Sequence, residues 1–313
     1  MRKNARGTKQ GDRLLKMQGK FDRGPVEFKS HIAQHEGQVM AIGTADVISV
    51  PPTHSIIGAA EMMTQCGFRR LPVTDPGTKN LRGIITSGDV MNLMGGGDKS
   101  RLVQVKHGGN LVAALNESVR TIMTRKPETL KSDAHLLDAL EIIVGKKIGG
   151  LPIVDGDGVL CGILTERDVM RVLAAERSTL AVEDVMSSAL RVTTPDSPIS
   201  TVTHDMTTYR FRRLPVVSDD VLFGIITATD IMRYLGSREI FHQLTTGNIA
   251  EVTGLPVRNL MAGNLFTTTP EKSVNDAARE MLEKNIGALP VIEGGRLIGL
   301  VTEFDLVRAF AEE

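Results

Sequence analysis

The chain has 313 residues, and its 37 Lys and Arg residues are balanced by 37 Asp and Glu residues. Proteins whose main partner is nucleic acid or a membrane surface usually carry an excess of positive charge, so this balance argues against both classes. The length indicates about two domains. Cys66 and Cys161 form no CxxC or Cys/His spacing, which leaves no readable disulfide framework or zinc module.

The N-terminal region is basic and has no apolar core of the kind that a signal peptide needs. Its first 30 residues hold nine Lys or Arg and three Asp or Glu, a composition typical of a solvated arm. The alternative is an arm that binds an acidic partner or nucleic acid. His31 and His35 have i,i+4 spacing without further ligands, so no metal site is predicted. No apolar run is long enough to span a bilayer. We therefore expect a soluble, cytoplasmic protein.

The rest of the chain contains a fourfold repeat. A Leu-Pro-apolar triplet is followed 16 to 18 residues later by the Asp of a Thr-x-x-Asp motif, four times. Copies 1 and 3 share the hexapeptide FRRLPV, at residues 68–73 and 211–216, whereas copies 2 and 4 share K-x-I-G-x-L-P. Asn110 corresponds to Asn248 at the same offset as copies 2 and 4. The pattern indicates a duplicated doublet, with the break between the two doublets near residues 174–182.

Each repeat is predicted to be β-α-β-β-α. In chain order, apolar residues at i, i+3, i+4 and i+7 predict amphipathic helices that begin at Ile56, Leu136 and Val274. Copy 4 shows the whole unit: LFTTTP (265–270) is expected to be a strand, and LPVIEGGRLIGLVT (289–302) two strands around a Gly-rich turn. The following TEFDLVRAF is expected to open the second helix. A unit of this size is expected to need a partner that buries its sheet.

These motifs resemble those of cystathionine-β-synthase (CBS) domains. The signature LPV followed by G-h-h-T-x-x-D, where h is apolar, covers residues 41–311 and resembles four CBS domains in two paired (Bateman) modules. The arrangement is similar to the γ subunit of AMP-activated protein kinase and its stand-alone archaeal relatives. It implies an α/β fold of four repeats docked into a disc. The expected boundaries are a basic extension (1–40), CBS domains at 41–96, 117–177, 178–238 and 255–313, and linkers at 97–116 and 239–254.

Each Thr-x-x-Asp motif lies at a predicted strand-to-helix junction. The Thr can cap the helix and the acid at N3 can complete a capping box, although Glu or Gln is the usual partner there. The same junction offers free N–H groups and a positive dipole end to a phosphate, and a carboxylate can accept hydrogen bonds from a ribose diol. The resemblance implies ribose binding by Asp89, Asp168, Asp230 and Asp305, and helix capping with phosphate contact by Thr86, Thr165, Thr227 and Thr302.

The resemblance also implies two further sets of nucleotide-binding positions. The residue before each Asp faces phosphate in relatives; here it is Gly88, Arg167, Thr229 or Phe304, of which Arg167 fits and Phe304 departs from the pattern. The residues two and three places before each Pro line the adenine and phosphate pocket: Arg69 and Arg70, Gly149 and Gly150, Arg212 and Arg213, Gly287 and Ala288.

These residue types suit that task, because Arg forms bidentate contacts with phosphate and Gly allows a flat base to approach the backbone. We infer that Arg70 and Arg213 bind the phosphates of nucleotides that lie partly on the partner repeat. Each module would then have one phosphate-binding arginine site. The alternative is that each arginine pair forms a solvated helix end.

The expected function is regulatory. AMP, ADP or ATP is expected to bind between paired CBS domains and to signal to an unidentified regulated protein, with no cofactor and no membrane. Catalysis is not expected, because no catalytic constellation is readable. The alternatives are a scaffold or nucleic-acid-associated CBS protein, or a sensor of another adenosyl ligand such as S-adenosylmethionine, whose sulfonium cation the arginines would repel. We expect a monomeric disc or a homodimer.

Overall fold

The structure is a computed structural model that describes residues 39–175, 178–237, 244–263 and 265–312. Almost all of the basic N-terminal extension, including His31 and His35, lies outside the described residues, as do parts of the predicted break near 174–182 and of the second linker. Among the helices of the described ranges, none is both long and apolar enough to cross a membrane.

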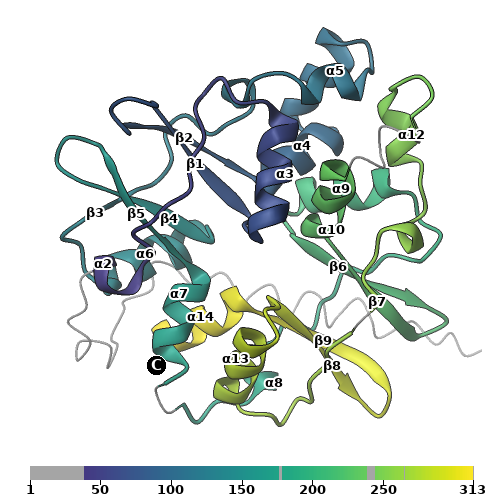
Figure 1. The fold of residues 1–313 in the computed structure, drawn as a ribbon. Coiled ribbons are helices and arrows are strands. Elements are labelled where there is room, and N and C mark those ends of the chain that lie inside the picture. Colours follow the sequence, from purple (N-terminus) through teal and green to yellow (C-terminus); the bar gives the residue numbers. More distant parts are fainter. Residues whose placement is uncertain (1–38, 176–177, 238–243, 264, 313) are drawn as a thin grey trace, which may run out of the picture.

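The described chain forms four repeats that share one order of elements (Figure 1). Repeat 1 contains α3 (Ile56–Cys66), β1 (Arg70–Thr74), β2 (Leu81–Thr86) and α4 (Ser87–Met94). Repeat 2 contains β3 (Leu130–Lys131), α6 (Leu136–Lys146), β4 (Gly150–Val154), β5 (Leu160–Thr165) and α7 (Glu166–Leu173). Repeat 3 contains α9 (Ile199–Thr208), β6 (Arg213–Ser218), β7 (Val221–Thr227) and α10 (Ala228–Gly236). Repeat 4 contains α13 (Val274–Glu283), β8 (Ala288–Glu293), β9 (Arg296–Thr302) and α14 (Glu303–Glu312).

Short helical turns precede and connect the repeats. Before repeat 1 lies α2 (Val39–Ile42), and before repeat 3 lies α8 (Val182–Val185). The first linker contains η2 (Asp98–Ser100), the π-helical turn η3 (Leu102–Lys106), α5 (Leu111–Leu115) and η4 (Val119–Thr121). The second linker contains α12 (Ile249–Thr253) and η5 (Val257–Asn259).

The helices and hairpins predicted for copy 4 are confirmed. In α13 the side chains of Val274, Ala277, Ala278 and Met281 are buried, as the 3.6-residue period requires. Strands β8 and β9 pair antiparallel around a turn in which Gly294 and Gly295 both have positive φ, 55° and 78°, the geometry of a two-residue hairpin turn.

The strand predicted at residues 265–270 is wrong, since repeat 4 has only a single parallel bridge there, between Thr268 and Val291. Repeats 1 and 3 also have one bridge each, and only repeat 2 has a strand, β3. The next hydrogen bond of the ladder explains the difference: Ser132 donates to the Val154 carbonyl at 3.0 Å in repeat 2. The corresponding residues of repeats 1, 3 and 4 are prolines, which have no N–H to donate: Pro52, Pro195 and Pro270.

Repeats 1 and 2, and likewise repeats 3 and 4, are joined through their hairpins. The Leu81 amide donates to the Gly158 carbonyl at 3.0 Å, which links the hairpins of repeats 1 and 2. The segment that precedes each repeat also pairs with the hairpin of its module partner, as in the reciprocal bonds of Ser187 with Leu300, both 3.0 Å. These contacts confirm the two predicted modules and satisfy part of the backbone at the sheet edges.

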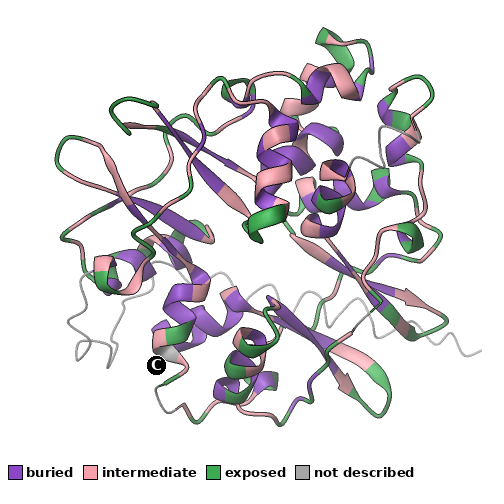
Figure 2. Ribbon diagram, viewed as in Figure 1, coloured by how far each residue is buried: buried purple, intermediate pink, exposed green. Residues whose placement is uncertain are grey.

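The hydrophobic cores run across the modules instead of within them. Helix α3 packs on α10 and α4 on α9, which joins repeats 1 and 3, while α7 packs on α14 and joins repeats 2 and 4. Each pair of repeats encloses one core, and Figure 2 shows buried residues concentrated on these facing helices. Neighbours around the molecule therefore follow the order 1, 2, 4, 3, with repeats 1 and 4 on one diagonal and repeats 2 and 3 on the other (Figure 1).

The two linkers are equivalent, as the sequence offset predicts. The Leu111 amide donates to Gly247 and the Ile249 amide to Gly109, at 2.8 and 2.9 Å, around an antiparallel bridge of Asn110 with Asn248. The two asparagines also cap α5 and α12. This reciprocal pairing joins the linker of the first module to the linker of the second.

Candidate ligand-binding centre between the four repeats

All four Thr-x-x-Asp motifs form capping boxes. In each, the aspartate Oδ2 accepts hydrogen bonds from both the backbone N–H and the hydroxyl of the Thr; for Thr227 and Asp230 these distances are 2.9 and 2.6 Å. The four aspartates are buried, with 5–7% of their area exposed. The capping interpretation is therefore confirmed, with Asp in place of the usual Glu. Since capping occupies only Oδ2, it leaves Oδ1 of each carboxylate for a second partner.

That second partner is a basic side chain in every repeat. In repeats 2, 3 and 4 it is the arginine three residues further along the same helix. The pairs are Asp168 with Arg171 at 2.8 Å, Asp230 with Arg233 at 3.0 Å, and Asp305 with Arg308 at 3.6 Å. In repeat 1 it is Lys99, which reaches Asp89 from the linker.

The backbone places each Thr-x-x-Asp motif beside the residue three places before the Pro. In repeat 1 the Ser87 amide donates to the Arg69 carbonyl at 2.9 Å, and in repeat 2 the Glu166 amide donates to Gly149 at 3.1 Å. Equivalent bonds occur in repeats 3 and 4. The two sets of predicted site residues, far apart in the sequence, are therefore adjacent at the start of the second helix of every repeat.

The first arginine of each FRRLPV hexapeptide crosses a diagonal of the molecule. Arg69 of repeat 1 pairs with Glu303 of repeat 4. Arg212 of repeat 3 pairs with Glu166 of repeat 2, with Nη2 at 2.8 and 2.9 Å from the two carboxylate oxygens. Both glutamate side chains are only 2% exposed, so these charge-assisted bonds are largely shielded from water.

The second arginine of each hexapeptide stays within its own module. A Cβ atom built on Gly149 would lie 2.6 Å from Arg70 Nη2, and one built on Gly287 would lie 2.9 Å from Arg213 Nη2. These guanidinium groups fill the space that larger side chains on the partner repeat would need, together with Arg69, whose Nη2 would lie 2.5 Å from the Cβ on Gly287. This explains the glycines at these positions. Ala288, beside Gly287, is buried at the start of β8. The alternative that the arginine pairs form solvated helix ends is wrong, because Arg70 and Arg213 begin strands and face the middle of the molecule.

Glu166 and Glu303 were not among the residues predicted from the sequence. They follow the Thr in TERD and TEFD, whereas copies 1 and 3 have Ser and Ala at that position. The signal that could have identified them is this alternation, because the copies with arginine pairs lack the glutamate and the copies with small residues carry it.

Arg167, predicted to face phosphate, bridges repeats 2 and 4 in this structure. Its Nε and Nη2 donate to Glu303 Oε1 at 2.9 and 2.6 Å, Nη2 also donates to the Ile286 carbonyl at 2.8 Å, and Nη1 donates to Asn285 Oδ1. Phe304, at the equivalent position of repeat 4, is half-buried. Glu303 thus pairs with two arginines and Glu166 with one, so the two carboxylates are not equivalent.

We call the resulting group the central cluster. It consists of five guanidinium groups and two carboxylates: Arg69, Arg70, Arg167, Arg212, Arg213, Glu166 and Glu303.

Positive charge is in excess in the central cluster. Burial and the positive charges of Arg212 and Arg69 lower the pKa of Arg70 to about 10, although Glu166 opposes the shift. Burial, Arg69 and Arg212 lower the pKa of Arg213 to about 9. Burial alone would raise the pKa of Glu303, but its arginine neighbours lower it to about 2. All of these groups are charged at pH 7, and the arginines are short of anionic partners.

The central cluster also has donors without acceptors. The Arg212 Nη1 atom is buried and has no hydrogen-bond partner. Within the described ranges, the guanidinium groups of Arg70 and Arg213 donate no hydrogen bond. A buried donor such as Arg212 Nη1 is costly unless an acceptor is supplied, and an oxyanion would supply one to it and to the half-buried Arg70 and Arg213. The described residues contain no group of three His, Cys, Asp or Glu side chains that could hold a metal ion.

Comparisons with known proteins agree with the fourfold repeat. A family model described as "CBS domain" matches residues 39–96, 119–175, 182–237 and 257–312. The uncharacterized protein MJ1225 of Methanocaldococcus jannaschii is 39% identical over 267 residues, which cover 85% of this chain and 95% of that protein. An uncharacterized 33.4 kDa protein of Thermofilum pendens is 26% identical over 258 residues, 82% of this chain and 86% of that one.

Two solved structures match most of the chain. The crystal structure of MJ1225, reported as a candidate archaeal homolog of γ-AMPK, has a TM-score of 0.83 and 38% sequence identity, and the match covers 88% of this chain and 100% of that chain. An uncharacterized conserved protein from Pyrococcus horikoshii matches with a TM-score of 0.56, 22% identity and the same coverage, which shows a shared fold alone.

Proposed function

The chain belongs to the CBS domain family, and on that premise we propose that it is a regulatory protein that binds adenine nucleotides. AMP, ADP or ATP binds in the clefts between paired repeats, with its phosphates directed to the central cluster, and the ligand-dependent packing is read by another protein. Such signalling requires that the nucleotide binds one arrangement of the repeats more tightly than another.

The observation that carries this proposal is the excess of positive charge among the half-buried arginines of the central cluster. Five guanidinium groups face two carboxylates, and Arg70 and Arg213 lack anionic partners in the described structure. A polyphosphate or phosphate monoester brings two or more negative oxygens, which suit the planar guanidinium. A sulfonium ligand such as S-adenosylmethionine would add a further positive charge, so the cluster favours phosphates over it.

The four aspartates support the ribose part of the proposal. Each uses Oδ2 to cap its helix and keeps Oδ1 outside the cap. Helix capping and diol binding are therefore compatible in one carboxylate, with the helix N-terminus beside it for phosphate. In this arrangement Thr86, Thr165, Thr227 and Thr302 hold the aspartates in place.

Isothermal titration calorimetry of the metabolite-stripped protein against AMP, ADP, ATP and S-adenosylmethionine tests the proposal. We expect binding of at least one adenine nucleotide with stoichiometry above one, and a loss of about tenfold or more at one site in Asp230→Asn. The matched control is Asp276→Asn, because Ser273 and Asp276 form the same kind of cap on α13, the first helix of its repeat. This control should lose stability but keep its nucleotide affinity.

The opposite result would indicate a scaffold. If no nucleotide gave heat and none raised the melting temperature at saturating concentration, the aspartates would be capping residues only. If Asp230→Asn and Asp276→Asn instead bound nucleotide with equal affinities, Asp230 would be a capping residue only.

A further inference from the structure

Repeat 1 differs from the other repeats in the side chain that pairs with its aspartate. The residue three positions after Asp89 is Asn92, where the other repeats have arginine. Asn92 instead organises the loop that follows α4. Its Oδ1 accepts the Lys99 amide at 2.8 Å and its carbonyl accepts the Gly97 amide at 3.2 Å. This folded loop brings the Lys99 ammonium to Asp89 Oδ1.

The Lys99 contact is more enclosed than the arginine pairs of repeats 2 and 3. The Lys99 side chain is 20% exposed and that of Asp89 is 9% exposed, whereas Arg171 and Arg233 are 60% and 62% exposed. An arginine on the same helix can move into solvent without disturbing the backbone. Lys99 is anchored by its own backbone bond to Asn92, so its ammonium has less freedom to leave.

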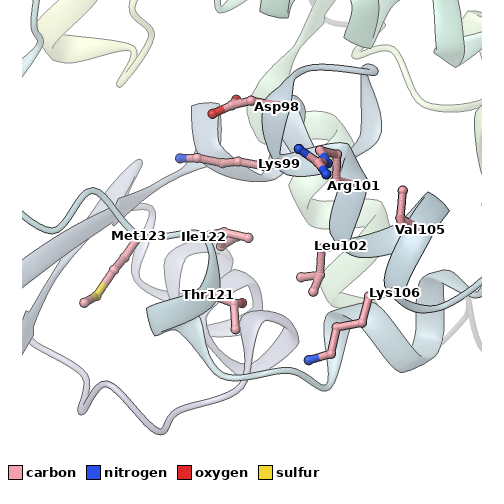
Figure 3. Close-up of a pocket in the computed structure, with 9 residues that line it drawn as sticks. All are labelled: Asp98, Lys99, Arg101, Leu102, Val105, Lys106, Thr121, Ile122 and Met123. Carbon is pink, nitrogen blue, oxygen red and sulfur yellow. The ribbon is translucent and has the colours of Figure 1, made fainter.

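Figure 3 shows the surroundings of Lys99. The residues of the loop and of the π-helical turn η3 line one side of a surface hollow, and Thr121, Ile122 and Met123 line the other. The Lys99 side chain extends away from Arg101 in this view. The Lys99 ammonium contacts Asp89 Oδ1, and the position of Lys99 is set by the loop through the bond of its amide with Asn92.

We propose that Lys99 is a specificity-determining residue that closes the diol-binding position of repeat 1. This inference rests on the proposed function. The Thr86 amide and hydroxyl occupy Asp89 Oδ2, at 2.7 and 2.8 Å, and Lys99 occupies Oδ1. A nucleotide can use this carboxylate only after it displaces a largely buried ammonium, which is unfavourable unless a phosphate takes over the charge.

The four sites are thus chemically unequal. Repeat 1 has Gly88 at the position before the Asp, so no side chain at that position helps to bind phosphate. With the diol position closed as well, repeat 1 is a weaker nucleotide site than repeats 2 and 3 at neutral pH. Removal of the ammonium leaves a buried carboxylate that needs hydrogen-bond donors, which a ribose diol provides.

Titration of Lys99→Met with AMP by calorimetry tests this inference. We expect an additional site, or a gain of about tenfold in the affinity of the weakest class of sites, equivalent to about 1.4 kcal/mol. Lys99→Arg keeps a cation at this position and should behave as the wild type. Arg171→Met removes the exposed partner of Asp168 and should change affinity much less. The gain should disappear in the double variant Asp89→Asn, Lys99→Met.

The results separate the two proposals. If the wild type binds no adenine nucleotide, the proposed function fails. If the wild type binds nucleotide but the isotherms of Lys99→Met and wild type superimpose, the proposed function stands and the role of Lys99 is refuted. Circular dichroism verifies that the variants are folded, and Lys99→Gln, which keeps a polar side chain, repeats the measurement if Lys99→Met is unstable.

Discussion

Replacement of Arg213 by Met is expected to stabilise the ligand-free protein while it removes nucleotide binding. Burial and the positive charges of Arg69 and Arg212 lower the pKa of Arg213 from 12.5 to about 9. One pKa unit corresponds to about 1.4 kcal/mol, so the charge opposes folding by about 5 kcal/mol before solvent screening. Because Arg213 is partly exposed, we expect a net gain of about 1–2 kcal/mol in the free energy of unfolding.

Met suits this test because it keeps an unbranched apolar stem of similar reach. Thermal unfolding of stripped wild type and Arg213→Met, each with and without saturating AMP or ATP, measures both effects. In a chain of this length, about 1 kcal/mol shifts the melting temperature by about 2–4 °C. We expect the variant to melt higher without nucleotide and to gain less from nucleotide than the wild type does. Arg296→Met, at an exposed position where β9 begins, is the control and should change neither quantity appreciably.

Two results would refute the reasoning. A ligand-free Arg213→Met protein less stable than the wild type by about 1 kcal/mol or more would mean that the guanidinium contributes packing or bonds that outweigh its desolvation. A variant stabilised by nucleotide as much as the wild type would mean that Arg213 does not contact the phosphates.

Two further predictions concern the same central cluster. Gly150→Ala should lower stability in urea titrations by about 1–3 kcal/mol and weaken nucleotide binding, because the new Cβ would meet the Arg70 guanidinium and would lie 2.8 Å from the Leu164 carbonyl oxygen. The control Gly145→Ala, at a helical position with nothing within 4 Å of the added Cβ, should be neutral or stabilising in the same titrations. For Glu303, whose pKa in the folded protein is about 2 against an ordinary 4.5, the stabilisation is complete above pH 4.5 and is lost as the pH falls toward 2. Glu303→Gln should therefore flatten the loss of unfolding free energy between pH 5 and pH 3, and equal acid slopes in the two proteins would contradict the ion pairs seen with Arg69 and Arg167.

Much of the fold follows from local patterns in the sequence. The apolar period that begins at Val274, the glycine turn at residues 294–295 and the capping chemistry of Thr302 with Asp305 each act over a few residues, so they can be read without knowledge of the fold. The missing first strands have an equally local cause, because a proline in repeats 1, 3 and 4 interrupts the ladder that Ser132 continues in repeat 2.

The sequence by itself also determined which residue types come together at the start of the second helix of each repeat, since FRRLPV and Thr-x-x-Asp occur at fixed spacing. Only the tertiary structure decided their partners. Arg69 pairs with Glu303 across 234 positions of sequence, and Arg167 of repeat 2 pairs with the same carboxylate. These pairings depend on how the two modules dock, because docking buries helix faces that would be exposed in a single repeat. Lys99 belongs to the same class, because a loop of the first linker acquires its role only when it folds back on Asn92 and reaches the buried Asp89.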